Sequence, residues 1–250
     1  MSLRAVAFGD VALGRWGAVF SPSRELPSFA VLGTEPAQVL SAAVEGDSSP
    51  GAEWWVTGEG LDLAIAPEDD HAGTADDGFD QLVTVRGEVP SDGPREVELL
   101  GCRGERAEEL EAGSFELIRD IRAWFSLGEG LAFGAVRPRR ASGQADEQVA
   151  ATIFEAGHPL AVAEPRLSTT YTDEGLPIRA TLELWLPQNE EEQEEQEAET
   201  TVSYPRRAAG RAAGPGITHD LGSLRVHARP FRWRAAGRDG AGVYLLAWAK

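Results

Sequence analysis

Short segments with β-strand character recur along the whole chain, and they constrain its fold more than any other feature. Gly, Pro, Asp and Ser separate them, as in sandwiches and barrels rather than in units of alternating strands and helices. The sequence therefore predicts a mainly antiparallel all-β fold with few short helices. The expected strands are Leu3–Phe8, Trp16–Phe20, Phe29–Leu32, Glu53–Thr57, Leu61–Ala66, Leu82–Val89, Glu96–Gly101, Phe115–Phe125, Leu131–Val136, Val149–Phe154, Ile178–Leu186, Thr201–Tyr204, Leu224–Arg234 and Val243–Trp248.

Alternation of apolar and polar residues is sharpest in Ile178–Leu186. A strand has a side-chain period of two, so its even positions, from Ile178 to Leu186, share one face. Arg179, Thr181, Glu183 and Trp185 then share the other. In Leu224–Arg229, His227 alternates in the same way with apolar neighbours, which predicts an outward position for it.

Three stretches leave their secondary structure open. Phe115–Phe125 fits one apolar face of a helix, but its odd positions also fit a strand, and glycines bracket it. We predict a strand there. Short helices are possible at Glu35–Val44 and Arg106–Glu111.

Two acidic stretches are predicted as loops. Pro67–Asp80 is rich in Asp, and Pro187–Thr200 contains the run Glu190–Glu197, where dense like charges favour solvation. Two other stretches are similar to each other: Trp54–Leu63 and Trp124–Phe133 each contain Gly-Glu-Gly after an aromatic strand end. Either a duplication or convergence on one turn chemistry explains this similarity.

The formal net charge of −18 over 250 residues disfavours nucleic acid and anionic membrane surfaces as partners. The chain has no apolar run long enough for a membrane span and no signal-peptide pattern, so we expect a cytoplasmic location. Arginines nevertheless cluster late in the sequence. We expect them on outward strand faces or beside acidic loops: Arg206, Arg207, Arg211, Arg225, Arg229, Arg232, Arg234 and Arg238.

Sequence motifs for metals, cofactors and nucleophilic catalysis are absent. Cys102 is the single cysteine and lies in a predicted strand, where a small apolar role is expected, and the four histidines lack the short spacing of a zinc site. The Asp-rich stretch Pro67–Asp80 lacks the EF-hand spacing for calcium. Because no Walker A or GxSxG motif is present either, we predict no metal and no cofactor.

Aromatic residues are the best sequence evidence for a ligand site. Seven tryptophans could line a barrel interior together with a few placed polar groups, although ordinary core packing also explains them. Trp185 lies beside Glu183 on the polar face of its strand, and Trp124 follows a charged run. The candidate ligand-binding residues are Trp124, Trp185, Glu183 and His219, and no catalytic residue is assigned.

The layout of the second half resembles a known superfamily. The run Arg119–Arg139, then Asp146–Glu155, and the ending Phe231-Arg232-Trp233 through Gly240–Tyr244 resemble the tandem lipocalin-like proteins that include AttH-like proteins and carotenoid 1,2-hydratases. This resemblance implies two calyx-like β domains around an apolar ligand, and its characterised members act on terpenoid or polyketide-like molecules. We expect the halves to be residues 1–105 and 106–250, with one single large β domain as the alternative.

Two functional hypotheses follow. The first is binding, with or without a non-redox conversion such as hydration, isomerisation or cyclisation, of an apolar small molecule such as a terpenoid or polyketide. The second is a non-catalytic interaction or structural protein that uses its acidic loops to meet a basic partner. A cavity lined by apolar side chains would favour the first, whereas a filled interior would favour the second; the sequence leaves enzyme activity and the oligomeric state undecided.

Overall fold

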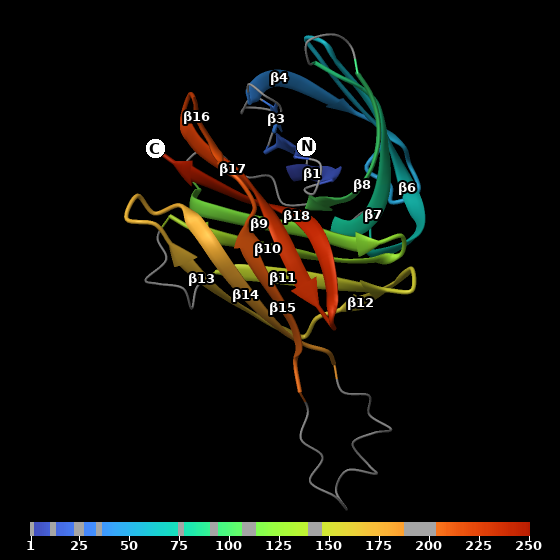
Figure 1. Cartoon of the computed structure of the whole chain (residues 1–250), viewed down its shortest axis with the longest axis vertical. Coiled ribbons are helices and arrows are strands. Elements are labelled where there is room, and N and C mark those ends of the chain that lie inside the picture. The colour runs from blue at the N-terminus through green and yellow to red at the C-terminus, as the bar shows by residue number, and fades with distance from the viewer. Residues whose placement is uncertain are drawn as a thin grey trace, which may run out of the picture.

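The computed structural model describes residues 3–10, 14–22, 28–33, 37–74, 78–90, 95–106, 114–139, 147–187 and 204–250. Within these ranges every regular element is a β-strand and every strand pairing is antiparallel, which confirms the predicted fold class. Figure 1 shows two assemblies of strands, one formed by the first half of the chain and one by the second.

The first half forms a closed barrel in which consecutive strands are neighbours. The first strand pairs with the eighth, from Leu3 opposite Arg106 to Phe8 opposite Gly101, and this pairing closes the barrel. Closure leaves no free edge in this sheet. Its strands are β1 (Leu3–Asp10), β2 (Arg15–Ser21), β3 (Phe29–Leu32), β4 (Gln38–Glu45), β5 (Trp54–Gly58), β6 (Leu61–Thr74), β7 (Gly78–Val89) and β8 (Arg95–Arg106).

The second half forms a ten-stranded sheet in the order β12-β11-β10-β9-β18-β17-β15-β14-β13, with β16 paired to β17. The last strand therefore lies in the middle of the sheet. Pro230 lies where β17 exchanges its neighbour β16 for β15, a position that suits a residue without an N–H donor. The strands are β9 (Phe115–Ser126), β10 (Glu129–Pro138), β11 (Gln148–Glu155), β12 (His158–Ala161), β13 (Glu164–Tyr171), β14 (Pro177–Trp185), β15 (Arg206–Ala212), β16 (Ile217–Leu221), β17 (Leu224–Ala235) and β18 (Arg238–Ala249).

Strand β9 separates two apolar interiors. Its residues alternate between the two faces, so Ile118 and Trp124 pack with residues of the barrel's outer wall, whereas Ile121 and Ala123 pack with the inner face of the second sheet. The second sheet curves, because residues of β10 and β11 share an apolar cluster with residues of β14, β15 and β17. A third cluster, which includes Trp54 and Phe79, fills the inside of the barrel.

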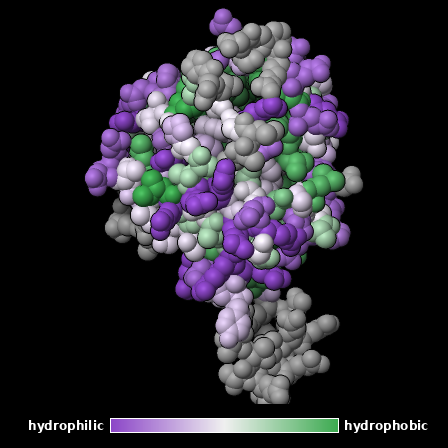
Figure 2. All heavy atoms as spheres, viewed as in Figure 1, coloured by the Kyte–Doolittle hydropathy of each residue, from purple (hydrophilic) through white to green (hydrophobic). Residues whose placement is uncertain are grey.

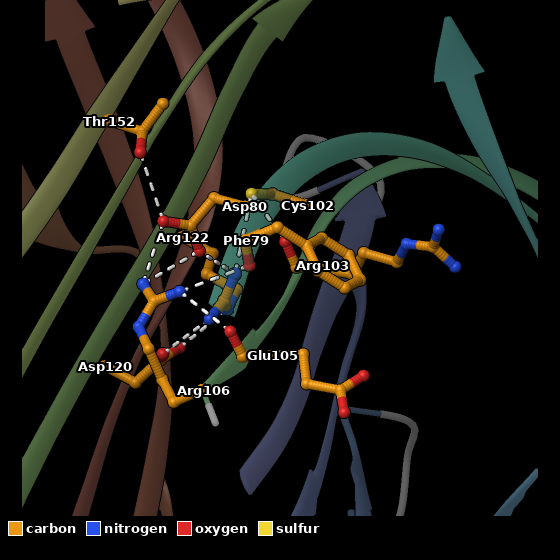
Figure 3. A network of polar contacts seen from close by, with 9 residues as sticks. All are labelled: Phe79, Asp80, Cys102, Arg103, Glu105, Arg106, Asp120, Arg122 and Thr152. Atoms are coloured by element: carbon orange, nitrogen blue, oxygen red, sulfur yellow. Dashed lines mark hydrogen bonds and ion pairs between the residues drawn. The ribbon is translucent and has the colours of Figure 1, made fainter. Parts of the chain in front are cut away.

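A buried polar network joins the barrel to the second sheet (Figure 3). Arg122 of β9 donates to both carboxylate oxygens of Asp120, at 2.9 and 2.8 Å, and reaches Asp80 of β7 at 3.2 Å. Asp80 also accepts from Arg106 at 2.8 and 3.0 Å and from Thr152 of β11 at 3.2 Å. The carboxylate of Asp80, which belongs to β7, is therefore contacted by side chains from three other strands, β8, β9 and β11, and these strands come from both sheets.

The charges of this network stabilise one another. Burial raises the pKa of Asp80, but Arg106 and Arg122 outweigh burial and hold that pKa below its ordinary value. Gly104 of β8 leaves the room that the network needs, because a Cβ there would lie 2.3 Å from Asp80 Oδ1 and 2.7 Å from an Arg122 nitrogen. Cys102 lies beside them with its pKa raised to about 12 by burial, so it stays a thiol and fills space as predicted.

The structure corrects several local expectations. Glu35–Val44, where a helix was possible, contains strand β4, and Pro67–Asp80, predicted as a loop, is largely strand in β6 and β7. Asp80, the last residue of that stretch, lies in β7 opposite Gly104 of β8 and is held by the arginines of the network. Phe115–Phe125 is a strand as predicted. Arg106 ends β8, and the rest of Arg106–Glu111, most of Pro187–Thr200 and most of Thr201–Tyr204 lie outside the described residues.

The two similar Gly-Glu-Gly stretches both form hairpins, but their turns differ in position. β5 ends at Gly58 and the turn residue Gly60 has a φ of 69°. β9 ends at Ser126, and the left-handed turn residue is Gly128, with a φ of 75°. The aligned glycines therefore have different roles, which favours convergence on one turn chemistry.

The predicted division between residues 105 and 106 lies one residue before the end of β8 (Arg95–Arg106), the last strand of the barrel, and the second sheet begins with β9 at Phe115. A single large domain remains the alternative because the two sheets share a continuous apolar cluster and the network around Asp80. We retain two domains as the proposal.

Candidate ligand-binding pocket

A hollow of about 340 Å³ opens at one end of the curved second sheet, and we call it the arginine pocket. Its walls combine apolar side chains with two arginines and a tyrosine, the composition typical of small-molecule sites. Residues of β9, β10, β13 and β18 and of the turn after β13 contribute to it. They are Leu117, Arg119, Arg137, Tyr171, Gly175, Leu246 and Trp248.

Arg119 is the buried charge of this pocket. It occupies an inward position of β9, between Leu117 and Ile121, and only 5% of it is exposed. One of its terminal nitrogens is ion-paired with Glu147, which also accepts from Arg137 at 2.6 and 2.8 Å. One carboxylate thus lies between two guanidinium groups.

Arg119 keeps its positive charge in this setting. Burial lowers its pKa, but the carboxylate of Glu147 outweighs burial and raises the pKa above its ordinary value. Its Nε is buried and finds no hydrogen-bond partner in the part of the chain that the structure describes. Because buried donors are rarely left without an acceptor, this nitrogen marks a position where a ligand atom would be favourable.

Hydroxyl groups lie beside the buried arginine. Tyr244 of β18 is fully buried, and its hydroxyl is 3.1 Å from that of Thr169 on β13. Burial raises the pKa of Tyr244 above its ordinary value, and the neighbouring Tyr171 raises it further. Tyr244 is therefore a neutral phenol that can donate or accept a hydrogen bond, while Tyr171 is 39% exposed at the pocket wall.

His227 is a second buried polar group on the same inner face, although the sequence pattern placed it outward. It lies opposite Leu246 in the sheet and is 1% exposed. Its Nδ1 is 2.8 Å from the Thr218 hydroxyl, and its Nε2 has no partner among the described residues. Burial and the nearby cations Arg229 and Arg225 lower its pKa to about 4, so the imidazole is neutral at neutral pH.

Two other hollows lie on the second sheet. One, of about 320 Å³ at the opposite end of the second sheet, has Arg206 and Arg238 at its rim, each paired with a glutamate. Another lies on the outer face between β15, β17 and β18, with Arg211, Arg232 and Arg234 around it. Figure 2 shows hydrophilic residues gathered over this part of the surface. Arg119 Nε at the arginine pocket and Trp233 Nε1 at the hollow between β15, β17 and β18 are buried and have no partner among the described residues, and of these two groups only Arg119 is charged.

The late arginines are exposed on strand faces as expected, apart from Arg229. That side chain is half-buried and donates to the carbonyl oxygens of Gly214 at 2.9 Å and Pro177 at 3.2 Å. Arg229 therefore holds the turn after β15 against the start of β14.

The four sequence-predicted site residues are not brought together. Trp124 faces the barrel and donates its indole N–H to the Gly9 carbonyl oxygen at 2.9 Å. Glu183 pairs with Arg207 at 2.8 Å on the outer face of β14, where the Arg166 guanidinium lies 4.7 Å from the centre of the Trp185 ring. His219 is exposed on β16. Their role in ligand binding stays a prediction.

Sequence reasoning missed Arg119, Tyr171, Tyr244 and Trp248. A usable signal was present for Arg119, because a single charge at an inward position of a strand is unusual. The pairing of β18 with β9 and the curvature that places β13 at the same pocket could not be obtained from single segments. Among the described residues, no three potential ligands lie together as a metal site would require, and no helix could cross a membrane.

Comparison with known proteins finds a match in structure but none in sequence. No family model and no curated protein matches the chain by sequence. A solved structure does match: a protein of Nitrosomonas europaea provisionally designated AttH has a TM-score of 0.60 and 10% sequence identity, over 99% of this chain and 92% of that one. The chain has the fold of that AttH structure. The lipocalin-like AttH-type layout, with two barrel-like sheets in tandem, is the fold that the sequence resemblance implied.

Proposed function

We propose that the protein binds an apolar small molecule in the arginine pocket. The observation that carries this proposal is the combination of apolar walls from Leu117, Leu246 and Trp248 with the buried Arg119, whose Nε has no partner among the described residues. Apolar contact supplies affinity, and a few placed polar groups fix orientation. The AttH-type fold supports this function because lipocalin-like sheets commonly enclose such ligands.

The ligand class that fits the sequence resemblance is a terpenoid or polyketide. A hydration, isomerisation or cyclisation would need a proton donor that reaches the ligand, and the raised pKa of the fully buried Tyr244 phenol makes it a weak acid for that role. The structure supports binding more directly than conversion, because the remaining polar groups of the pocket are engaged with one another. Analysis of terpenoids incubated with the protein for isomerised or hydrated products tests the conversion.

The acidic-loop alternative has less support. Pro67–Asp80 is mainly hairpin, with Asp80 committed to arginines and Asp70 to His158 at 2.7 Å. The Glu190–Glu197 run lies outside the described residues.

Tryptophan fluorescence tests the proposed site. Addition of farnesol, a neutral terpenoid alcohol, should change the emission saturably, with a Kd on the order of 0.1 mM. About fifteen non-hydrogen atoms at roughly 0.3–0.4 kcal/mol each give about 5 kcal/mol. Because Trp248 lines the pocket, Trp248→Phe should remove most of the change.

The matched control is Trp55→Phe, since Trp55 is 46% exposed on the barrel. This variant should respond as the wild type does. If a range of neutral apolar molecules, terpenoids and aromatic polyketides included, leaves the wild-type emission unchanged and shows no heat of binding, the proposal fails. A response that persists in Trp248→Phe but not in Trp55→Phe would move the site to the barrel.

A further inference from the structure

We infer that the arginine pocket takes the carboxylate of an amphipathic acid, whose apolar part lies along Leu117, Leu246 and Trp248. This inference rests on the proposed function and adds the chemistry of the ligand's polar end. It begins from charge: Arg119 and Arg137 share the single carboxylate of Glu147. Glu116 also approaches Arg137, at 3.8 Å, but its side chain is 55% exposed and screened by water.

The local charge therefore favours a single anion. Two guanidinium groups and one buried carboxylate leave about one positive charge at the inner wall, and an unneutralised buried charge is costly. Glu147 occupies only one terminal nitrogen of Arg119, and Arg119 Nε is without a partner among the described residues. A ligand anion would supply both the missing charge and the missing acceptor.

The geometry of the donors favours a carboxylate. A guanidinium group presents planar donors that match the two oxygens of a carboxylate. Tyr244 of β18 is a diagonal neighbour of Arg119 in the pairing of β18 with β9. It offers a neutral hydroxyl to the same region. An alcohol or ester could accept one of these hydrogen bonds, but it could not neutralise Arg119.

The apolar walls distinguish an amphipathic acid from a small anion. Leu117 and Trp248 face each other across β9 and β18, and Leu246 lies opposite Arg119 itself. An apolar chain attached to the carboxylate would cover these side chains, at about 25 cal/mol for each Å² removed from water. Acetate or inorganic phosphate would leave them uncovered, so a free small anion should bind far more weakly.

Calorimetry with matched ligands near neutral pH tests this inference. Decanoic acid should bind about tenfold or more tightly than methyl decanoate or decanol, because a hydrogen-bonded charge contributes about 1.5–3 kcal/mol. Arg119→Gln should weaken decanoate binding about 10–100-fold and leave the ester within about threefold. Arg119→Lys, which keeps the charge without the planar donors, should fall between the two. Arg206→Gln, at the rim of the other hollow, is the control and should bind as the wild type does.

The outcomes separate the two proposals. If the ester and alcohol bind as tightly as the acid, the carboxylate inference is overturned and the apolar site stands. If none of the three binds and farnesol does not bind either, the proposed function fails with it. If acetate or phosphate binds as tightly as decanoate, the pocket is a small-anion site. The comparison of acid with ester in the wild type decides the inference even if Arg119→Gln fails to fold.

Discussion

Replacement of Arg122 by methionine should lower the free energy of unfolding by about 3–5 kcal/mol, the usual cost of removing one partner from a buried ion pair. Arg122 is the partner that the structure gives to both carboxylate oxygens of Asp120, and it also reaches Asp80. Without it, Asp120 would lie at the junction of the two sheets with its charge uncompensated. Equilibrium unfolding in urea, followed by tryptophan fluorescence and circular dichroism, measures the change.

Arg86→Met is the matched control. Arg86 pairs with Glu98 at 2.7 Å, but both side chains are more than half exposed, so its loss should change stability by no more than about 1 kcal/mol. The double variant Arg122→Met with Asp120→Leu should recover part of the loss, since it removes the stranded carboxylate as well. If Arg122→Met unfolds at the same urea concentration and with the same slope as the wild type, the network does not hold the barrel to the second sheet.

The same network shows what sequence patterns could and could not predict. The alternation in Phe115–Phe125 predicted a strand correctly, because a period of two needs only local residues. It could not show that Asp120 and Arg122 face a second sheet rather than water. Asp80, a partner of Arg122, is 42 residues from it in sequence, in a stretch whose acidic composition is typical of a loop. A long-range ion pair overrides that local signal.

The candidate pocket was harder to predict than the fold. Its residues come from β9, β10, β13 and β18, and the strand order together with the curvature of the sheet brings these segments to one pocket. Tryptophan content directed attention to Trp124 and Trp185, but the first packs against the barrel and the second lies on an outer face beneath Arg166. Aromatic residues mark apolar surfaces in general, whereas the buried Arg119 Nε, which has no partner among the described residues, is visible only in the structure.

The second large expected effect concerns pH and His227. The folded protein should lose about 3 kcal/mol of stability as pH falls from about 6.5 to about 4, or roughly 1.4 kcal/mol for each pH unit. The sign follows from the lowered pKa of about 4 for the buried imidazole. Above the ordinary histidine pKa neither state is protonated. Between the two values the unfolded chain binds a proton that the folded protein does not, and unfolding is favoured.

His227→Gln should remove this dependence, because glutamine can keep a hydrogen bond to Thr218 and does not titrate. The measurement is the difference in unfolding free energy between about pH 7 and pH 4.5, a window above the range in which Asp80, with its lowered pKa, becomes protonated in the folded state. His219→Gln is the control, since His219 lies on the adjacent strand β16 with its side chain exposed, and it should retain the wild-type slope. An NMR titration that placed the His227 pKa near 6.5 would contradict the prediction. Such a value would mean that the inner face of the second sheet admits water beside the imidazole, and the dry environment on which the affinity of the neighbouring arginine pocket depends would be absent as well.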